Sequence, residues 1–309
     1  MPLLFQRSMN LRKQLSIFSL SKGLFEDLVS DRIIKKGKVI CSTHLFFIAG
    51  LPKSGTTWLS QLLTTAPGIV KLNGSMIRRY PKNPKLVNVH DVSHEMLTCA
   101  PKNCLSLLKL HLNPYPRNFS ILENHDIRTV VLIRDLRDVL ISRLYHILLW
   151  KSHWDNKRLV NLPQEERLLE SMKGVIPELD VYVIDYFKSW ISGWIDRAEA
   201  YPEDTLIIKY EEMKTDLFSV MKRIFSFYEY KVTDEDIRKV ISKQNRIQKK
   251  HRKRELKMNL KLTGRAHSTF RKGLTGEWRN EFNQEIKEFI KEHAGDILIK
   301  SGYENDLSW

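Results

Sequence analysis

Short apolar runs recur along the chain, and each is followed by residues in which apolar side chains repeat at helical spacing. Runs that are apolar along their whole length are typical of parallel strands buried on both faces. Three runs have this character, and a fourth candidate ends in the mixed sequence Lys-Leu-His-Leu. The four predicted strands cover residues 45–49, 129–133, 206–208 and 105–112.

Helical spacing predicts five helices around these strands. They cover residues 56–65, 136–150, 178–199, 215–229 and 283–299. Strands that alternate with helices indicate one α/β domain with a central, mainly parallel sheet flanked by helices. We expect this domain to cover residues 41–309, after an N-terminal arm or helix over residues 1–40.

In open parallel sheets, ligands bind beyond the carboxyl ends of the strands. The predicted strands therefore define one rim on which we expect the chemistry of the chain. Its four segments are residues 50–57, 111–117, 134–142 and 210–214.

Composition adds a preference for anionic partners. Of 309 residues, 42% are hydrophobic and 28% are charged, which is ordinary for a globular protein, but the formal net charge is +15. Such a surplus favours nucleotides, sulfated or phosphorylated groups, nucleic acid or an acidic membrane surface. The three cysteines form no CxxC pattern, which argues against a disulfide framework and fits a reducing cytosol.

Targeting signals are weak. The sequence has no run of about 18 apolar residues, so we predict no transmembrane helix and no stable membrane insertion. Residues 1–25 are basic and poor in acidic residues, which fits either an organelle transit peptide or a surface helix or arm. We expect a cytoplasmic protein.

Residues 246–257 depart from the α/β pattern, because they carry seven Lys or Arg residues and one Glu. Three interpretations stay open for this stretch. It can be a solvated basic loop, a gate over an anionic cofactor, or a patch for nucleic acid or membranes.

The segment AGLPKSGTTWL, residues 49–59, is close to a phosphate-binding P-loop. Gly50 and Gly55 have the spacing of G-x-x-x-x-G, but Thr56 stands where a nucleoside triphosphatase has lysine. The lysine lies inside the loop, at Lys53. We expect an anion site in which this lysine reaches the bridging oxygen of a diphosphate-like group.

Other donors of this loop support the same interpretation. Backbone N–H groups and the dipole at a helix start attract anions. Gly55 lets the backbone approach a ligand closely, and Ser54, Thr56 and Thr57 add hydroxyl donors.

Two further basic segments can contact a second phosphate. Arg134 ends a predicted strand and Ser142 lies on the following helix, while Arg137 and Asp138 are expected to form local ion pairs. Taken alone, this segment also fits an amphipathic helix with charges. The sequence Arg-Lys-Gly at residues 271–273 fits a phosphate clamp or a surface loop.

Together the motifs resemble a known family. In order, they are PKSGTTWL, K-x-H-L, R-x-x-R-D-x-x-x-S, K-Y-E-E-M and F-R-K-G-x-x-G-E-W-R-N. Their order and spacing resemble the cytosolic-type sulfotransferases that use 3′-phosphoadenosine 5′-phosphosulfate (PAPS), over roughly residues 40–282.

The resemblance implies a PAPS site without a metal. It assigns the loop to the 5′-phosphosulfate and Lys53 to the bridging oxygen of the breaking S–O bond. It assigns Trp58 to stacking on adenine and Tyr210 to a place near it. The residues implied for the whole nucleotide are Pro52, Lys53, Ser54, Gly55, Thr56, Thr57, Trp58, Arg134, Ser142, Tyr210, Phe270, Arg271, Lys272 and Gly273.

The resemblance also implies the catalytic residues. His111 would take the proton of the acceptor as general base, and Lys109 would help to bind the sulfuryl group. A histidine at the end of a predicted strand suits this role.

The sequence departs from the family in three places. The Thr-Ser-Phe segment that contacts adenine in the family has no clear match, and Ser242 is a poor candidate for it. The family's adenine-packing aromatic residue falls on Thr269, with Phe270 beside it, and the dimer motif K-x-x-x-T-V-x-x-x-E is missing after residue 282. We therefore expect a monomer, or a dimer that does not use this motif.

The acceptor pocket is expected from loops in residues 75–104, 145–180 and 240–268. Trp150, Trp154, Met96 and Leu97 can line this pocket or belong to the core.

We predict a sulfotransferase that moves a sulfuryl group from PAPS to a hydroxyl of a small-molecule alcohol or phenol by in-line attack. An amine is the second choice of acceptor, and nucleic acid is not expected as a partner. One alternative is a Mg²⁺-dependent kinase for nucleotides or small molecules on a variant P-loop. Another is a non-catalytic protein that binds polyanions through residues 246–257.

Overall fold

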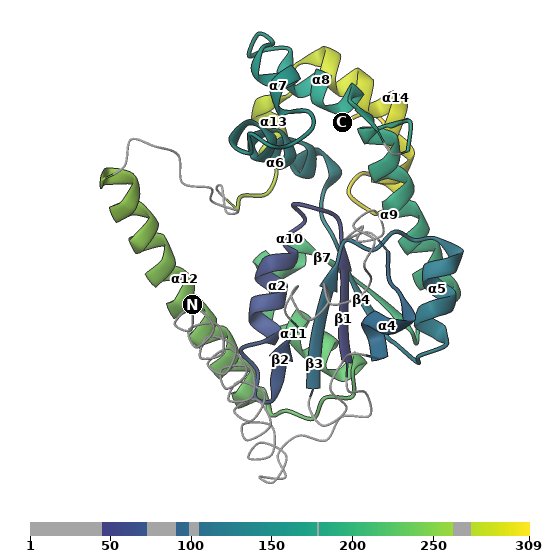
Figure 1. Cartoon of the computed structure of the whole chain (residues 1–309), viewed down its shortest axis with the longest axis vertical. Helices are drawn as coiled ribbons and strands as arrows, with labels where there is room; N and C mark the ends of the chain where they lie inside the picture. The colour runs from purple at the N-terminus through teal and green to yellow at the C-terminus, as the bar shows by residue number, and fades with distance from the viewer. Residues whose placement is uncertain (1–44, 73–90, 99–104, 178, 262–272) are drawn as a thin grey trace, which may run out of the picture.

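The computed structural model describes residues 45–72, 91–98, 105–177, 179–261 and 273–309. The predicted N-terminal arm, residues 1–40, lies outside the described residues. Five strands form a sheet in the order β2-β3-β1-β4-β7, and all neighbouring pairs are parallel (Figure 1). The strands are β1 Leu45–Gly50, β2 Ile69–Lys71, β3 Leu105–Leu110, β4 Thr129–Ile133 and β7 Thr205–Lys209. The predicted α/β class with a parallel central sheet is confirmed.

The central strand β1 is apolar at every position because both of its faces are covered. All six of its residues are buried. Leu45, Phe47 and Ala49 belong to one hydrophobic cluster, whereas Phe46 and Ile48 belong to the other. Because successive side chains of a strand point to opposite faces, a sheet covered on both faces needs apolar residues at odd and even positions alike.

Helices cover both faces of the sheet (Figure 1). One face packs against α2 Thr56–Leu63, α11 Leu217–Phe227 and the start of α12 Asp234–Lys261. The other packs against α5 Pro116–Glu123 and α9 Val183–Ala200. That second cluster continues into α6 Leu136–Leu149, α8 Arg167–Lys173 and α14 Gln284–Lys300. The short helices are α4 His94–Thr98, α7 Asn156–Val160, α10 Tyr210–Thr215 and α13 Trp278–Glu281.

Side-chain caps fix where three helices begin. Asp135 accepts a hydrogen bond from the backbone N–H of Arg137 at the start of α6. Asp216 caps α11 in the same way, and Asn283 caps α14. Such a cap satisfies a backbone N–H that has no partner within the helix and is worth about 1 kcal/mol. The cap of α6 follows directly after β4, so it fixes the turn at the rim.

Several predicted boundaries were wrong for physical reasons. The helix predicted over residues 178–199 begins at Val183, because β5 Val175–Ile176 and β6 Val181–Tyr182 form an antiparallel hairpin before it. The helix predicted over residues 215–229 is divided into α10 and α11, because Asp216 has an extended φ of −139°. Strand β2 was missed, since three residues are too short to show a period.

Residues 246–257 lie within α12, so the interpretation of this stretch as a loop was wrong. The acceptor loop predicted over residues 240–268 is likewise helical as far as Lys261. Figure 1 shows α12 running away from the sheet after its packed start. Within the described ranges, no helix combines the length and apolar character that crossing a membrane requires.

Candidate functional site

The loop after β1 is folded as a backbone anion cradle. The N–H and the hydroxyl of Ser54 both donate to the carbonyl of Leu51, over 3.2 and 2.7 Å. Lys53 and Gly55 have φ angles of 75° and 97°, in the left-handed region. Successive residues that alternate between left-handed and right-handed backbone conformations turn their N–H groups toward one side. The loop then leads into the start of α2. The loop therefore has the geometry predicted for a site that binds an anion.

Gly55 is required by packing as well as by its backbone angle. A Cβ atom at this position would lie 2.5 Å from Cδ2 of Tyr210, which is the first residue of α10. Only a residue without a side chain allows the ring of Tyr210 so close to the loop. The contact brings together two motifs that are far apart in the sequence.

His111 lies beside the same loop. It directly follows β3, whose Leu110 is paired with Ala49 of β1, and its Nδ1 is 2.6 Å from the carbonyl oxygen of Gly50. A carbonyl oxygen can only accept a hydrogen bond, so Nδ1 must carry the hydrogen. In the neutral ring, Nε2 is then the nitrogen without a hydrogen, and it is the one that can take a proton.

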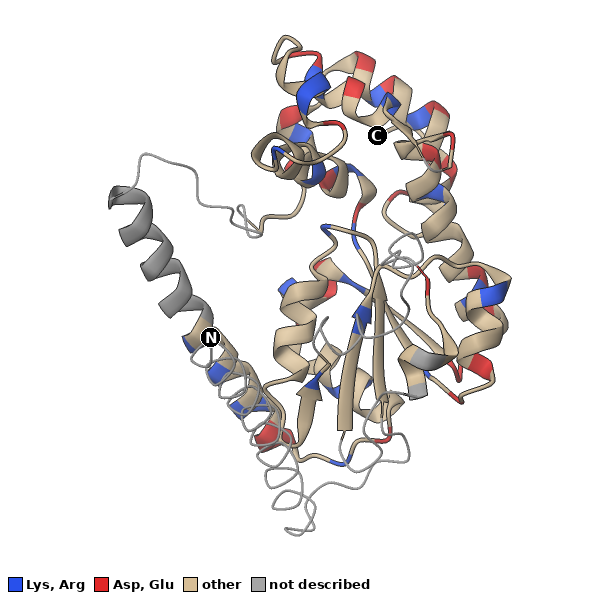
Figure 2. Cartoon of the chain, in the orientation of Figure 1, with Lys and Arg blue, Asp and Glu red and all other residues tan. Residues whose placement is uncertain are grey.

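Two lysines increase the positive potential of the rim. The pKa of Lys53 is lowered to about 8, first by burial and second by the charge of Arg134. Burial also lowers the pKa of Lys109, with a further contribution from Lys71. A lysine whose pKa is lowered by burial and by a neighbouring positive charge is stabilised in its charged form by an anion placed beside it. Figure 2 shows Lys and Arg near the upper ends of the strands, below α6.

Arg134 connects the cradle to the segment after residue 272. Its Nη2 donates to the carbonyl of Leu274 over 2.7 Å, and its Nη1 donates to the carbonyl of Lys53 over 3.4 Å. The guanidinium carbon also lies 4.6 Å from the ring centre of Tyr210. Its Nε is buried and has no hydrogen-bond partner in the described parts of the chain. A nearly buried guanidinium whose Nε is unused fits an anionic ligand.

Asp138 anchors the segment 273–277, a role that the sequence analysis missed. Its two carboxylate oxygens accept hydrogen bonds from the backbone N–H groups of Gly276, at 2.7 Å, and Trp278, at 3.2 Å. It also lies 3.5 Å from Arg134, so the expected local ion pair is confirmed. The sequence R-x-x-R-D gives the charge of Asp138 but does not show that it binds a distant backbone.

Other predicted nucleotide residues are placed less closely. Trp58 meets Tyr210 edge-on, with ring centres 5.8 Å apart. Tyr210 Oη donates to the carbonyl of Gly273 over 3.3 Å. Ser142 lies half-buried in the second turn of α6. Pro52 and Thr57 are half-buried at the loop and the start of α2, and Thr56 is buried. Phe270, Arg271 and Lys272 fall outside the described residues, so their roles stay predictions.

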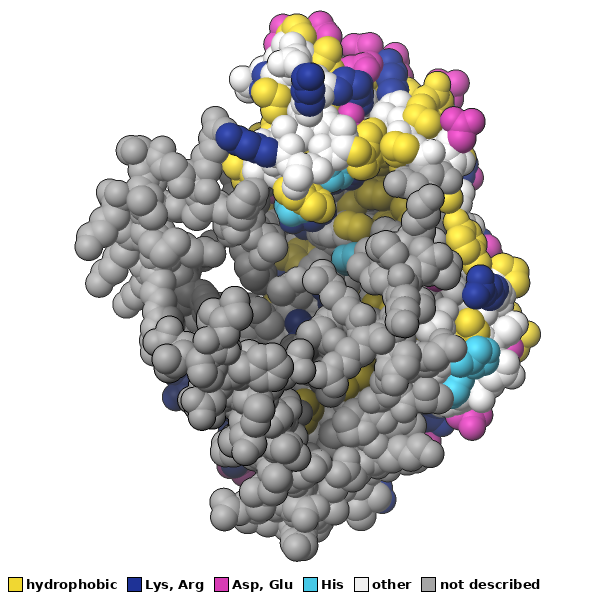
Figure 3. Space-filling view, viewed as in Figure 1, with side chains coloured by type: hydrophobic (Ala, Val, Ile, Leu, Met, Phe, Trp, Pro, Cys, Tyr) yellow, Lys and Arg dark blue, Asp and Glu magenta, His cyan; other side chains and the backbone are white. Residues whose placement is uncertain are grey.

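A hollow lies below α6, and hydrophobic and histidine side chains gather around it (Figure 3). Trp150 and Trp154 are 44% and 45% exposed, so they do not belong to the core. They form a row of rings with His146 and His153, whose neighbouring centres are 5.4 to 5.5 Å apart. Leu97, in contrast, is a core residue. Met96 is half-buried and packs against the same core cluster. Of these four residues, the two tryptophans are therefore the ones for which pocket lining stays open.

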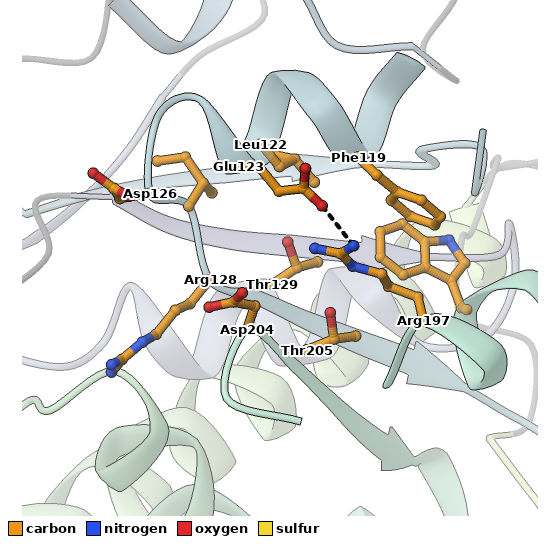
Figure 4. A pocket seen from close by; sticks show the side chains of 11 residues that line it. Phe119, Leu122, Glu123, Asp126, Arg128, Thr129, Arg197, Asp204 and Thr205 are labelled. Carbon is orange, nitrogen blue, oxygen red and sulfur yellow. Dashed lines mark ion pairs between the residues drawn. The ribbon is translucent and has the colours of Figure 1, made fainter. Parts of the chain in front are cut away.

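A separate pocket of about 400 Å³ lies at the amino-terminal ends of the strands, which form the edge of the sheet opposite the rim (Figure 4). Thr129 and Thr205, the first residues of β4 and β7, line it together with side chains from α5 and α9. There Arg197 pairs with Glu123 over 2.6 Å. None of the predicted site residues lines this pocket.

Comparison with known proteins places the chain among relatives of one kind. A family model described as a sulfotransferase domain matches residues 44–302. The chain is 28% identical over 261 residues to sulfotransferase 1E1 of Cavia porcellus, with 80% of each chain covered. It is 25% identical over 304 residues to flavonol 3-sulfotransferase of Flaveria bidentis, with 90% of this chain and 89% of the relative covered.

A solved structure with the same fold is that of the mouse sulfotransferase SULT7A1 complexed with PAP. Its TM-score is 0.57 at 20% sequence identity, and the match covers 84% of this chain and 86% of that one. At this identity the likeness supports the fold alone.

Proposed function

The chain belongs to the sulfotransferase family, and on that premise we propose that it moves a sulfuryl group from PAPS to a hydroxyl of a small molecule, with His111 as general base. The observation that carries this proposal is the hydrogen bond between His111 Nδ1 and the carbonyl of Gly50. Because this bond places the ring hydrogen on Nδ1, Nε2 is the nitrogen that can accept a proton at the edge of the anion cradle. Gly50 ends the strand that leads into the loop, so this bond holds the histidine next to the anion site. Sulfuryl transfer needs a base in this position beside the bound donor.

The residues of the rim fit the donor. PAPS supplies an activated sulfuryl group linked through oxygen to a 5′-phosphate, and its 3′-phosphate gives a second anionic end. We assign the 5′ end to the loop of residues 52–57, where Lys53 and backbone N–H groups would hold it. We assign the 3′-phosphate to Arg134 and Gly273, together with Ser142, Arg271 and Lys272. The unused Nε of Arg134 supports this assignment.

In the proposed reaction, each residue acts on a named atom. His111 Nε2 takes the proton of the acceptor hydroxyl while that oxygen bonds to sulfur. The bond between sulfur and the bridging oxygen breaks on the opposite side, and Lys53 stabilises the negative charge that develops there. Lys109 contacts the sulfuryl oxygens. The products are a sulfate ester and adenosine 3′,5′-bisphosphate (PAP), with one proton on the histidine.

The remaining assignments complete the proposal. Trp58 and Tyr210, with Phe270, would flank the adenine. The acceptor would be an alcohol or phenol, with an amine as the second choice. We propose a cytoplasmic location, no nucleic-acid partner, and a monomer or a dimer that does not use the usual motif.

Replacing the base tests this proposal. His111→Ala should lower turnover by roughly 10²–10⁴-fold, the usual contribution of a positioned base. Calorimetry should show unchanged PAP binding in the same variant. His125→Ala is the matched control, because His125 pairs with His94 on the surface.

Two outcomes would contradict the proposal. Near-normal turnover in His111→Ala would remove this residue from the mechanism. Phosphoryl transfer from ATP that needs Mg²⁺, without sulfuryl transfer from labelled PAPS, would favour the kinase alternative.

A further inference from the structure

Arg137 packs against two tryptophans, Trp278 and Trp309. Its guanidinium carbon lies 3.7 Å from the ring centre of Trp278 and 4.5 Å from that of Trp309. The two indole rings meet edge-on, with centres 5.3 Å apart. Asp135 and Glu304 both form ion pairs with this guanidinium, at 2.8 and 2.5 Å. Arg137 is 1% exposed and its charge is compensated, so it is committed to these partners and not to a ligand.

The same end of the chain also contacts the start of α10. Tyr303 Oη donates to one carboxylate oxygen of Glu211 over 2.7 Å. The other oxygen of Glu211 accepts a hydrogen bond from the backbone N–H of Asp135 over 3.3 Å. Residues 303–309 therefore contact the turn into α6 both through Glu211 and through Arg137.

Trp278 connects these contacts to the segment 273–277, because it directly follows that segment in the chain. Its backbone N–H is bound by Asp138, the carboxylate that also binds Gly276. Asp138 lies 3.5 Å from Arg134, whose Nη2 donates to the carbonyl of Leu274. The position of the indole ring is thus coupled, through one carboxylate, to the arginine of the rim.

We propose that Trp309 and Arg137 are positioning residues that hold the segment 273–277 in place for the 3′-phosphate of the nucleotide. Trp309 packs on Arg137, and Arg137 packs on Trp278. The position of Trp278 then determines where the segment 273–277 lies relative to Arg134. This inference rests on the donor proposed above. Its consequence is specific, because the loss of Trp309 affects discrimination at the 3′ end and leaves the 5′ cradle unchanged.

The contact energies indicate the size of the effect. A cation packed on an aromatic face in a largely buried place, together with an edge-on aromatic pair, corresponds to roughly 5- to 30-fold in binding. Trp309→Ala should reduce the preference for PAP over AMP by that factor. Trp309→Phe keeps a ring on Arg137 and should restore part of it. Glu304→Gln keeps the shape but removes a charge, and it should give a smaller loss.

The experiment is calorimetry of the full chain with PAP and with AMP, in wild type and in the three variants. Thermal unfolding of each variant verifies that it is folded. The matched control is Tyr201→Ala, which removes a ring that stacks on Arg197 at 3.7 Å on the opposite edge of the sheet. In steady-state assays, Trp309→Ala should raise the KM for PAPS while kcat is nearly unchanged.

The outcomes separate this inference from the proposed function. If wild type prefers PAP and Trp309→Ala keeps that preference, the positioning role is overturned while the donor stands. An equal loss for both nucleotides would show that Trp309 supports only the fold. A wild-type chain without any preference for PAP would contradict the proposed donor, and this inference with it.

Discussion

Arg134 and Arg197 are both nearly buried, at opposite edges of one sheet, and their charges are balanced differently. Arg197 forms an ion pair with Glu123, whose carboxylate oxygen lies 2.6 Å from the guanidinium. Arg134 donates to two backbone carbonyls, and its carboxylate neighbour Asp138 is 3.5 Å away and also accepts from two backbone N–H groups. A buried cation that shares its counter-charge in this way keeps the capacity to bind an anion.

The surroundings of the two arginines reinforce the difference. The pocket beside Arg197 is lined by Glu123, Asp126 and Asp204 (Figure 4). The carboxyl edge has Lys53, whose pKa is lowered in part by Arg134. Burial of an arginine is therefore poor evidence of an anion site by itself. What distinguishes the two arginines is that Glu123 pairs with Arg197, whereas Asp138 beside Arg134 also binds two backbone N–H groups.

The largest expected effect comes from removing each arginine in turn. Arg134→Ala should weaken PAP binding roughly 10²–10³-fold, because two charge-assisted hydrogen bonds to the 3′-phosphate are lost. Binding of AMP, which lacks that phosphate, should barely change. Arg197→Ala should leave both affinities unchanged and lower the free energy of unfolding by about 1–2 kcal/mol, since the Glu123 side chain that loses its partner is 46% exposed to solvent.

Calorimetry on the two nucleotides with both variants measures this contrast. Equal losses for PAP and AMP in Arg134→Ala would mean that this arginine holds the 5′ side or the fold. A loss of PAP binding in Arg197→Ala would abolish the distinction between the two edges.

A smaller effect is expected in the pH dependence of binding. The pKa of Lys53 is about 8 in the folded chain, mainly through burial. A bound anion favours the charged lysine, so binding takes up a proton above this pH. Affinity for PAP should be level below about pH 8 and fall above it by up to tenfold per pH unit. Lys53→Met should bind PAP more weakly without this decrease, and the exposed Lys222→Met should retain it.

The stability of the free chain should change in the opposite direction. The folded pKa of Lys53 lies below the ordinary lysine value of 10.5, so the unfolded chain holds more protons between about pH 8 and 10.5. The contribution of this group to the free energy of unfolding therefore rises with pH in that window and is constant below it. Affinity for PAP that stays level through about pH 9 would contradict the assignment of Lys53.

Parts of the molecule differ in how well the sequence predicted them. The loop after β1 was predicted because strand, glycines, lysine and helix start are contiguous, so local spacing contains the geometry. Nothing local predicts that Trp309 packs on Arg137, since that contact depends on where α14 ends. The helical state of residues 246–257 was missed for another reason. Only Ile247 and Leu256 are apolar in this stretch, so it has no apolar period to indicate a helix.

Short elements were beyond prediction as well. Strand β2 has three residues at the edge of the sheet, and its alternation from buried to exposed is too short to recognise. His111, in contrast, was placed correctly at the rim, because it follows a strand of six residues with a clear apolar run. The orientation of its ring could not be predicted, because it depends on the carbonyl of Gly50 in the neighbouring strand.

The smallest expected effect is that of metal removal, for which we predict no change in turnover. At the carboxyl edge the carboxylates already have partners, because Asp138 binds two backbone N–H groups, Asp135 pairs with Arg137, and Glu211 accepts from Tyr303. In the proposed reaction, Lys53 and Arg134 would supply the positive charge that Mg²⁺ provides in phosphoryl transfer. Acidic side chains also line the pocket at the other edge, so a divalent cation that binds there would not reach the reaction. Turnover with labelled PAPS, measured in excess EDTA and after Mg²⁺ is added back, tests this prediction. Loss in EDTA and recovery with Mg²⁺ would show that the cations of the rim do not suffice, and the comparison of the two edges would then have to include a metal.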